Sequence, residues 1–253
     1  MRRTVFWLAA AAAALSINAF ADSIPPAVAS AVADAARPAA DTARDAGRKP
    51  AATLAFVAIK PGAQVAELLP GGGYFTRLLA RVAGPSGHVY ALTPPPRPNA
   101  PAGAPDPAAA VNAIAADAHY GNVSVLQLAI AAPSLGLPQP VDVVWTSDNY
   151  HDLHNVPNAD IAAFNRHVFE ALKSGGMYIV LDHAAAAGHG TADTRTLHRI
   201  DPEAVKSEVL AAGFKLVGSS DALANPQDPH AAPVFDPSVR GHTDQFILKF
   251  VKP

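Results

Sequence analysis

The stretch VAELLPGGGYFT, residues 65–76, decides the fold. Residues 65–69 are apolar and strand-like, Gly71, Gly72 and Gly73 follow at once, and apolar residues then recur at helical spacing over 74–82. The stretch therefore predicts a strand, a glycine loop and a helix. Glycines let the backbone approach a ligand closely, and the following helix presents free N–H groups to it. A plain tight turn is the alternative, but the flanking strand and helix favour a ligand loop.

Strands and helices alternate along the rest of the chain. Seven strands with intervening helices predict a doubly wound, mostly parallel α/β sheet, and the last strand is expected to be antiparallel because no helix precedes it. In such sheets the ligand sits beyond the carboxyl ends of the strands. Residues 24–46 predict one or two short helices broken at Pro38. The other expected strands are 88–92, 123–130, 141–146, 177–181, 214–218 and 245–251, and the other expected helices are 51–57, 108–118, 161–172 (ended by Ser174-Gly175-Gly176) and 201–212.

Length and composition predict one globular domain. The 253 residues suffice for one core and are few for two domains. Half of them are hydrophobic and 16% are charged, which argues against a disordered chain. The formal net charge of −2 supplies no basic field, so we expect no nucleic-acid partner. There is no cysteine, and therefore no disulfide, thiol nucleophile or thiolate metal site.

The first 21 residues have the pattern of a secretory signal peptide. Arg2 and Arg3 precede an apolar run over 5–15, and Ala19-Phe20-Ala21 has the small-x-small form of a cleavage site. We therefore expect a mature single domain of residues 22–253 that is periplasmic or secreted. An uncleaved anchor is the alternative, although the run is short for the ~20 residues of a membrane span. No later stretch is apolar and long enough to span, so the mature chain is expected to have no membrane span.

The quoted stretch resembles motif I of class I S-adenosylmethionine-dependent methyltransferases. Residues 141–145, VDVVW, resemble the fourth strand of that family, and LKSGG at 172–176 is similar to the turn before its fifth strand. The resemblance runs from about Lys60 onward and implies a Rossmann-like methyltransferase fold. More narrowly, the chain resembles a group of exported methyltransferase-like proteins. The similar segments are 149–153, 182–183, 197–201 and 240–244.

The resemblance implies S-adenosylmethionine as the cofactor and a small molecule as the substrate. The glycine loop and Glu67 would hold the amino-acid part of the cofactor. Two departures from the family pattern stand out: Leu69 occupies a position that is usually glycine, and the second strand ends in Thr93 rather than in an acid that holds the ribose. The expected cofactor-binding residues are Glu67, Gly71, Gly72, Gly73, Tyr74, Thr93 and Asn149, and the expected substrate-binding residues are Tyr150, His198 and Arg199.

A histidine cluster follows the fourth strand, where residues 148–154 read DNYHDLH. Because the fourth and fifth strands are neighbours in the resembled fold, His151 is expected near Asp182 and His183, and these three are the candidate catalytic residues. A histidine beside a carboxylate can act as a general base near neutral pH. A loop histidine with a satisfied hydrogen bond is the alternative.

The histidines and Arg199 also suggest a metal site and an anion-binding site. Several histidines with a carboxylate suit zinc or another divalent metal, although no HExxH-like signature is present. Arg199 precedes a helix start and is expected to reach the cleft and bind an anionic group. Four other charged residues lie in apolar or turn contexts: Arg44, Asp45, Arg48 and Arg240. Most of them are expected to form surface ion pairs.

The expected compartment leaves a second function open. S-adenosylmethionine is made inside the cell, and charged groups cross a bilayer at high free-energy cost. The alternative to a methyltransferase is therefore an exported protein that uses the same fold to bind another small ligand, or a metal through the His/Asp cluster. The sequence leaves the oligomeric state and the methyl acceptor undefined.

Overall fold

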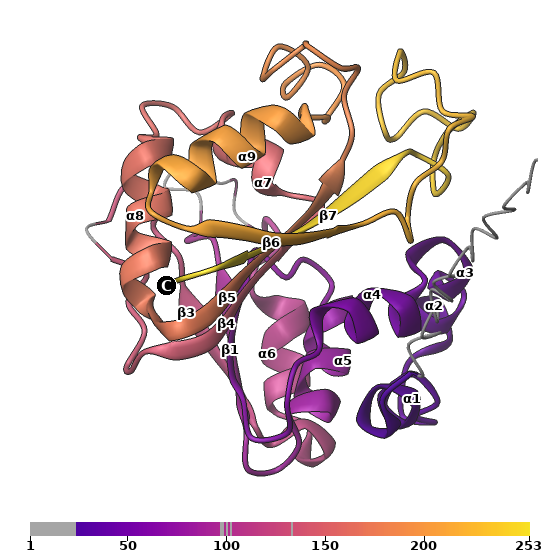
Figure 1. Cartoon of the computed structure of the whole chain (residues 1–253). Helices are drawn as coiled ribbons and strands as arrows, with labels where there is room; N and C mark the ends of the chain where they lie inside the picture. Colours follow the sequence, from indigo (N-terminus) through magenta and orange to yellow (C-terminus); the bar gives the residue numbers. More distant parts are fainter. Residues whose placement is uncertain (1–23, 97–98, 100, 102, 133) are drawn as a thin grey trace, which may run out of the picture.

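Seven strands form one sheet. The computed structural model describes residues 24–96, 99, 101, 103–132 and 134–253; the expected signal peptide, residues 1–21, and the expected mature start at Asp22 lie outside them. The strand order is β3-β2-β1-β4-β5-β7-β6 (Figure 1). The strands are β1 (Gln64–Leu68), β2 (His88–Thr93), β3 (Val123–Gln127), β4 (Val141–Ser147), β5 (Leu172–His183), β6 (Lys215–Ser220) and β7 (Gln245–Val251).

One strand runs against the others. The pairs β1–β2, β1–β4, β2–β3 and β4–β5 are parallel, whereas β7 is antiparallel to both β5 and β6. The predicted doubly wound, mostly parallel sheet with an antiparallel last strand is confirmed. β7 is inserted between β5 and β6, so β6 is the edge strand.

Helices cover both faces of the sheet. Figure 1 shows α4, α5 and α6 on one side of the strands and α8 and α9 on the other. The helices are α1 (Pro26–Val32), α2 (Ala39–Thr42), α3 (Asp45–Arg48), α4 (Pro50–Val57), α5 (Tyr74–Ala83), α6 (Ala109–Ala115), α7 (Tyr150–Leu153), α8 (Ile161–Ala171) and α9 (Pro202–Ala211), with a 3₁₀ turn at Ala118–Tyr120.

The two faces bury separate hydrophobic cores. Successive residues of a strand point to opposite faces, so in β4 Val143 and Trp145 pack with α4 and α5 while Val144 packs with α8 and α9. Burial on both faces explains why β4 is mostly an apolar run rather than an alternating one. The β1–loop–α5 unit is held between these cores, which fixes the glycine loop at one end of the sheet.

Local departures from the expected boundaries have local causes. The helix expected over 161–172 ends at Ala171 because Leu172 is already extended, and the predicted glycine stop lies inside β5, where Gly175 has φ 76°. The break at Pro38 is confirmed, since α2 begins directly after it. The short helix α7 was not expected. In the described part of the chain, every helix is too short or too polar to cross a bilayer.

Candidate functional site

A cavity of about 540 Å³ lies at the carboxyl ends of β1, β2 and β4. The strand order reverses between β1 and β4, and such a switch point is where doubly wound sheets bind ligands. The lining includes residues 69–72 after β1, Thr93 at the end of β2, and residues 147–149 at the end of β4. The volume is within the range of about 300–1,000 Å³ that small ligands occupy.

The glycines of the loop have two different roles. Gly71 and Gly72 line the cavity, and a Cβ atom at either position would meet no other atom within 4 Å. Gly73 lies behind them: it has φ 77°, and a Cβ there would lie 2.2 Å from Cδ1 of Ile114. Gly73 is therefore favoured by its positive φ and by its close packing on Ile114 of α6, and of the three glycines Gly71 and Gly72 line the cavity.

Leu69 has a backbone conformation that glycine adopts readily. Its φ is 53°, in the left-handed region that L-residues rarely occupy. Holding a non-glycine residue there costs on the order of 1–3 kcal/mol. The backbone is fixed on both sides, because the Leu69 N–H donates to the Leu92 carbonyl (2.8 Å) and the Leu69 carbonyl accepts from the Asn149 amide (2.9 Å). These two hydrogen bonds therefore hold the start of the glycine loop in place.

Glu67 is a buried carboxyl group on the wall of the cavity. Its side chain is 1% exposed and accepts a hydrogen bond of 2.6 Å from Thr76 in α5. Burial raises the pKa of Glu67 to about 7, against the smaller opposing effects of the Thr76 hydrogen bond and the Arg48 charge. The group can therefore switch between donor and acceptor near neutral pH.

Two arginines reach the cavity from the N-terminal helices. Arg48 pairs with Asp148 after β4 at 2.8 Å, and Arg44 lies beside it. Burial, with the like charge of Arg48 next, lowers the pKa of Arg44. Among the described residues, no carboxylate lies within 4.0 Å of Arg44, so a cation faces the cavity without an ionic partner. Arg48 thus forms an ion pair as expected, but the pair is partly buried, and both Arg44 and Arg48 line the cavity rather than lying on the outer surface.

Tyr74 fastens the segment of Arg44 and Arg48 to α5. Its hydroxyl donates to Asp45 at 2.6 Å, and the guanidinium groups of Arg44 and Arg48 lie over its ring at 5.4 and 4.8 Å from the centroid. The ring also lines the cavity, where the sequence predicted a cofactor contact. Cation–π contacts of this kind contribute about 0.5–2 kcal/mol.

Thr93 and Asn149 lie where the sequence predicted them. Both line the cavity. The Thr93 hydroxyl donates to the Leu126 carbonyl at 3.3 Å, a long bond that leaves the oxygen able to accept another. The Asn149 amide donates to the Leu69 carbonyl, and its oxygen accepts from Thr146. Asn149 therefore positions the glycine loop as well as lining the cavity.

His151 and Asp182 form a buried pair, and the predicted proximity of the two is confirmed. His151 Nδ1 lies 2.8 Å from Asp182 Oδ1, and the His151 backbone N–H donates to Asp182 Oδ2 at 2.8 Å. Burial opposes protonation of His151, but the Asp182 carboxylate outweighs it, so its pKa is raised. Only 2% of His151 is exposed, and the cavity is lined by its neighbour Asp152 instead.

His183 lies beside this pair but is directed elsewhere. Its Nδ1 bonds to the Thr243 hydroxyl at 2.8 Å, and its ring centroid is 6.3 Å from that of His151. Burial lowers the pKa of His183, so the ring is neutral at neutral pH. The structure therefore brings His183 near Asp182 without placing it on the cavity wall.

Two predicted substrate contacts are corrected. Arg199 is 0% exposed, and its guanidinium makes a bidentate pair with Asp228 at 2.8 and 3.2 Å. It also donates to two backbone carbonyls, so it stabilises the loop after β6 rather than binding substrate. Tyr150 is fully buried, and its hydroxyl donates to Glu208 at 2.8 Å. His198, the third predicted contact, is partly exposed and approaches His151 and Asp152.

Known proteins resemble this chain in structure only. No known family model matches it, and no curated protein matches it. The [4+2]-cyclase SpnF aligns over 85% of this chain and 82% of its own length, at 18% identity and a TM-score of 0.59. An S-adenosylmethionine-dependent methyltransferase from Aquifex aeolicus aligns over 79% of this chain and 87% of its own length, at 14% identity and a TM-score of 0.55. The glycopeptide N-methyltransferase MtfA was solved with S-adenosyl-L-homocysteine. It aligns over 83% of this chain and 87% of its own length, at 16% identity and a TM-score of 0.53.

These likenesses establish the fold. The chain has the Rossmann-like fold of class I S-adenosylmethionine-dependent methyltransferases. One of the similar structures is named as a cyclase, so the same fold serves more than one chemistry. The activity of this chain therefore depends on its site rather than on its fold.

Proposed function

We propose that this protein is an S-adenosylmethionine-dependent methyltransferase that acts on a small molecule. The observation that carries the proposal is the cavity at the β1/β4 switch point, walled by Gly71, Gly72 and the buried carboxyl of Glu67. Open space stands where a Cβ of either glycine would project, so the loop forms a cradle that a ligand can approach closely.

The polar groups around the cradle match the parts of this cofactor. Arg44 offers a guanidinium without an ionic partner in the described structure, which suits the carboxylate of the amino-acid part. Asp148 and Glu67 offer acceptors for its ammonium group. Thr93, at the end of β2, is placed to hydrogen-bond a ribose, where a single hydroxyl contributes about 0.5–1.5 kcal/mol.

The protein's part in the reaction is positioning. When bound, S-adenosylmethionine supplies an electrophilic methyl group. The chain's own residues hold the acceptor in line with it, and such orientation accounts for a large share of catalysis between two bound reactants. Asp152 and Val156 also line the cavity, and we propose that they contact the acceptor. The volume of about 540 Å³ fits a small molecule rather than a folded partner.

A second candidate function is the use of this fold, outside the cytoplasm, for another small ligand. The N-terminal sequence pattern favours it: Arg2, Arg3 and the apolar run that follows predict export. We propose a periplasmic or secreted location on that basis. Mass spectrometry of the exported protein should find a chain that begins at Asp22; a mature chain that still carries Arg2 would overturn the location.

Calorimetric titration with S-adenosylmethionine and S-adenosylhomocysteine tests the first proposal. We expect one molecule to bind per chain, with both compounds raising the melting temperature by mass action. Arg44→Gln should weaken binding of both compounds about tenfold or more, because a charged hydrogen bond contributes about 1.5–3 kcal/mol. Arg195→Gln is the matched control, since Arg195 is exposed outside the cavity. Absence of binding to either compound would favour the second candidate.

A further inference from the structure

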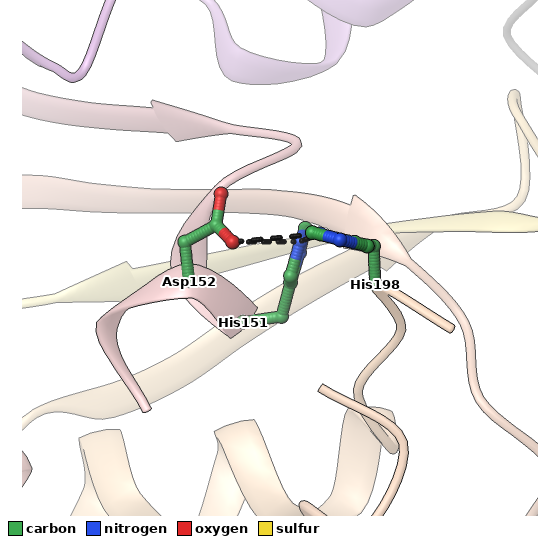
Figure 2. A group of neighbouring side chains, drawn as sticks. All are labelled: His151, Asp152 and His198. Carbon is green, nitrogen blue, oxygen red and sulfur yellow. Dashed lines mark hydrogen bonds and ion pairs between the residues drawn. The ribbon is translucent and has the colours of Figure 1, made fainter. Parts of the chain in front are cut away.

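Three side chains converge at the edge of the cavity, beyond the carboxyl ends of β4 and β5. His151 and Asp152 come from α7, and His198 comes from the loop before α9 (Figure 2). His151 Nε2 lies 3.3 Å from His198 Nδ1 and 3.4 Å from Asp152 Oδ1, and His198 Nδ1 lies 3.6 Å from Asp152 Oδ1. The ligand-type atoms of all three residues are therefore mutual neighbours.

These separations are those of ligands around one metal ion. Good N–H···O hydrogen bonds have donor–acceptor distances of about 2.7–3.2 Å, and the two nitrogen–oxygen contacts, at 3.4 and 3.6 Å, are longer. Two ligand atoms bound at about 2.0–2.2 Å to a tetrahedral zinc lie about 3.3–3.6 Å apart. The three measured distances fall within that interval, so the triangle fits the edges of a coordination tetrahedron better than it fits hydrogen bonding.

Asp182 prepares His151 for this role. The carboxylate accepts from His151 Nδ1 at 2.8 Å, so Nδ1 carries the proton and Nε2 presents its lone pair to Asp152 and His198. Two backbone N–H groups, of His151 and His183, fix Asp182 at 2.8 Å each. A carboxylate that holds the far nitrogen of a histidine ligand is the usual outer partner in metal sites.

We propose that His151, Asp152 and His198 bind one divalent transition-metal ion, of which zinc fits the donors best. Imidazole nitrogens are borderline donors that suit zinc, a carboxylate oxygen is a common third zinc ligand, and the chain has no cysteine to offer a softer set. Three protein ligands leave the fourth tetrahedral position open, as in catalytic rather than structural zinc sites. Asp152 also lines the cavity, so the site borders it, and the open position would take water or an oxygen or nitrogen atom of a small molecule.

The metal site does not depend on the proposed methyl transfer. It stands if the cavity binds a different ligand, and it assigns Nε2 of His151 to a metal, which prevents the same nitrogen from acting as a general base. His183, Asp148 and Asp182 are the other titratable groups nearby, and each is directed to another partner: Thr243, Arg48 and His151 respectively. The metal set is thus limited to three residues.

The test is a zinc titration of the full exported chain, purified without a histidine tag and freed of metal with a chelator. We expect one zinc per chain by calorimetry and elemental analysis, and visible absorption typical of tetrahedral Co²⁺ when cobalt replaces zinc. The side chains of His198 and Asp152 are 32% and 45% exposed, so His198→Gln and Asp152→Asn should fold. Each should weaken zinc binding by more than about 100-fold, the upper end of the loss that outer-shell changes cause.

Controls separate a built site from adventitious binding. His189→Gln removes an exposed imidazole that pairs with Asp193 at 2.8 Å outside the cluster, and it should bind zinc like the unchanged chain. Asp182→Asn should weaken zinc binding about 10–100-fold while circular dichroism confirms the fold. The proposal is overturned if His198→Gln retains full affinity or if His189→Gln loses as much. S-adenosylmethionine titration of His198→Gln keeps this failure distinct from failure of the proposed function, because His198 does not line the cradle.

Discussion

The side-chain amide of Asn149 donates to the Leu69 carbonyl at 2.9 Å and thereby ties the end of β4 to the loop after β1. The bond spans the switch point of the sheet and supports the one non-glycine residue of the loop that has a positive φ. Asn149 is thus as much a part of the loop's geometry as the glycines are.

Asn149→Asp tests this tie. Aspartate keeps the shape and can still accept from Thr146, but it has no N–H for the Leu69 carbonyl. We expect a loss of about 1–3 kcal/mol in the free energy of unfolding, because a carbonyl is left unpaired next to a new charge. Urea denaturation measures it. An unchanged midpoint, with no loss of ligand affinity, would show that the loop does not need the bond.

Gly72→Val separates ligand binding from folding. The backbone φ of Gly72 is ordinary and a Cβ meets no atom within 4 Å, so the protein should keep its cooperative melt. The branched side chain would fill the cradle, and we expect cofactor affinity to fall at least tenfold in calorimetry. Gly121→Val is the matched control, since Gly121 also has an ordinary φ and lies outside the cavity. Equal affinities for the two variants would reduce residues 71–73 to a turn.

Glu67→Gln should change how stability depends on pH. Burial raises the pKa of Glu67 from 4.5 to about 7, so the folded protein holds a proton that the unfolded chain releases between these values. The stability contributed by Glu67 is complete below pH 4.5 and is lost as the pH rises through 7. Relative to the unchanged protein, the free energy of unfolding of Glu67→Gln should therefore rise by about 3 kcal/mol between pH 4 and pH 8.

Denaturation of both proteins at several pH values measures the effect. Glutamine can still accept the Thr76 hydrogen bond, so the two chains differ mainly in charge. Glu203→Gln removes a carboxylate whose side chain is 75% exposed and controls for the change in net charge. A stability difference that does not vary with pH would mean that Glu67 does not titrate on unfolding.

His151→Gln distinguishes three roles of one residue. As a general base, His151 would contribute about 10²–10⁴-fold in rate, and its loss would leave zinc content unchanged. As a metal ligand, its loss would remove the zinc, whatever happens to the rate. Methyl-transfer rates and zinc content, measured on the same preparation, decide between them. Full activity with full zinc content would leave His151 as a structural partner of Asp182.

The sequence sufficed for the fold because its signals are local. The glycine triplet at 71–73 sits between a strand and a helix whose periodicities differ, and parallel strands place their ends together, which brought His151 to Asp182. The conformation of Leu69 could not be read from its identity, because leucine rarely takes a positive φ. Only the contacts of its backbone with Leu92 and Asn149 explain it.

The missed residues depend on contacts between distant segments. Arg48 meets Asp148 across 100 positions of sequence, and its alanine-rich surroundings gave no pattern that points to a cavity. The density of charges between Asp41 and Arg48 was the one available signal. Arg199 was misassigned for the same reason, because its partner Asp228 lies in an irregular loop without periodicity.

The insertion of β7 between β5 and β6 governs the order in which the sheet can assemble. Until residues 245–251 are available, β5 has an unpaired edge and β6 has no neighbouring strand at all. Such long-range pairing slows folding, and open edges invite intermolecular pairing. During the export that we propose, the chain would emerge with its amino-terminal segments first, so the sheet would stay incomplete until its last strand had crossed. We therefore expect the exported chain to be most prone to intermolecular pairing before β7 is in place, and truncation within β7 to leave the edges of β5 and β6 open.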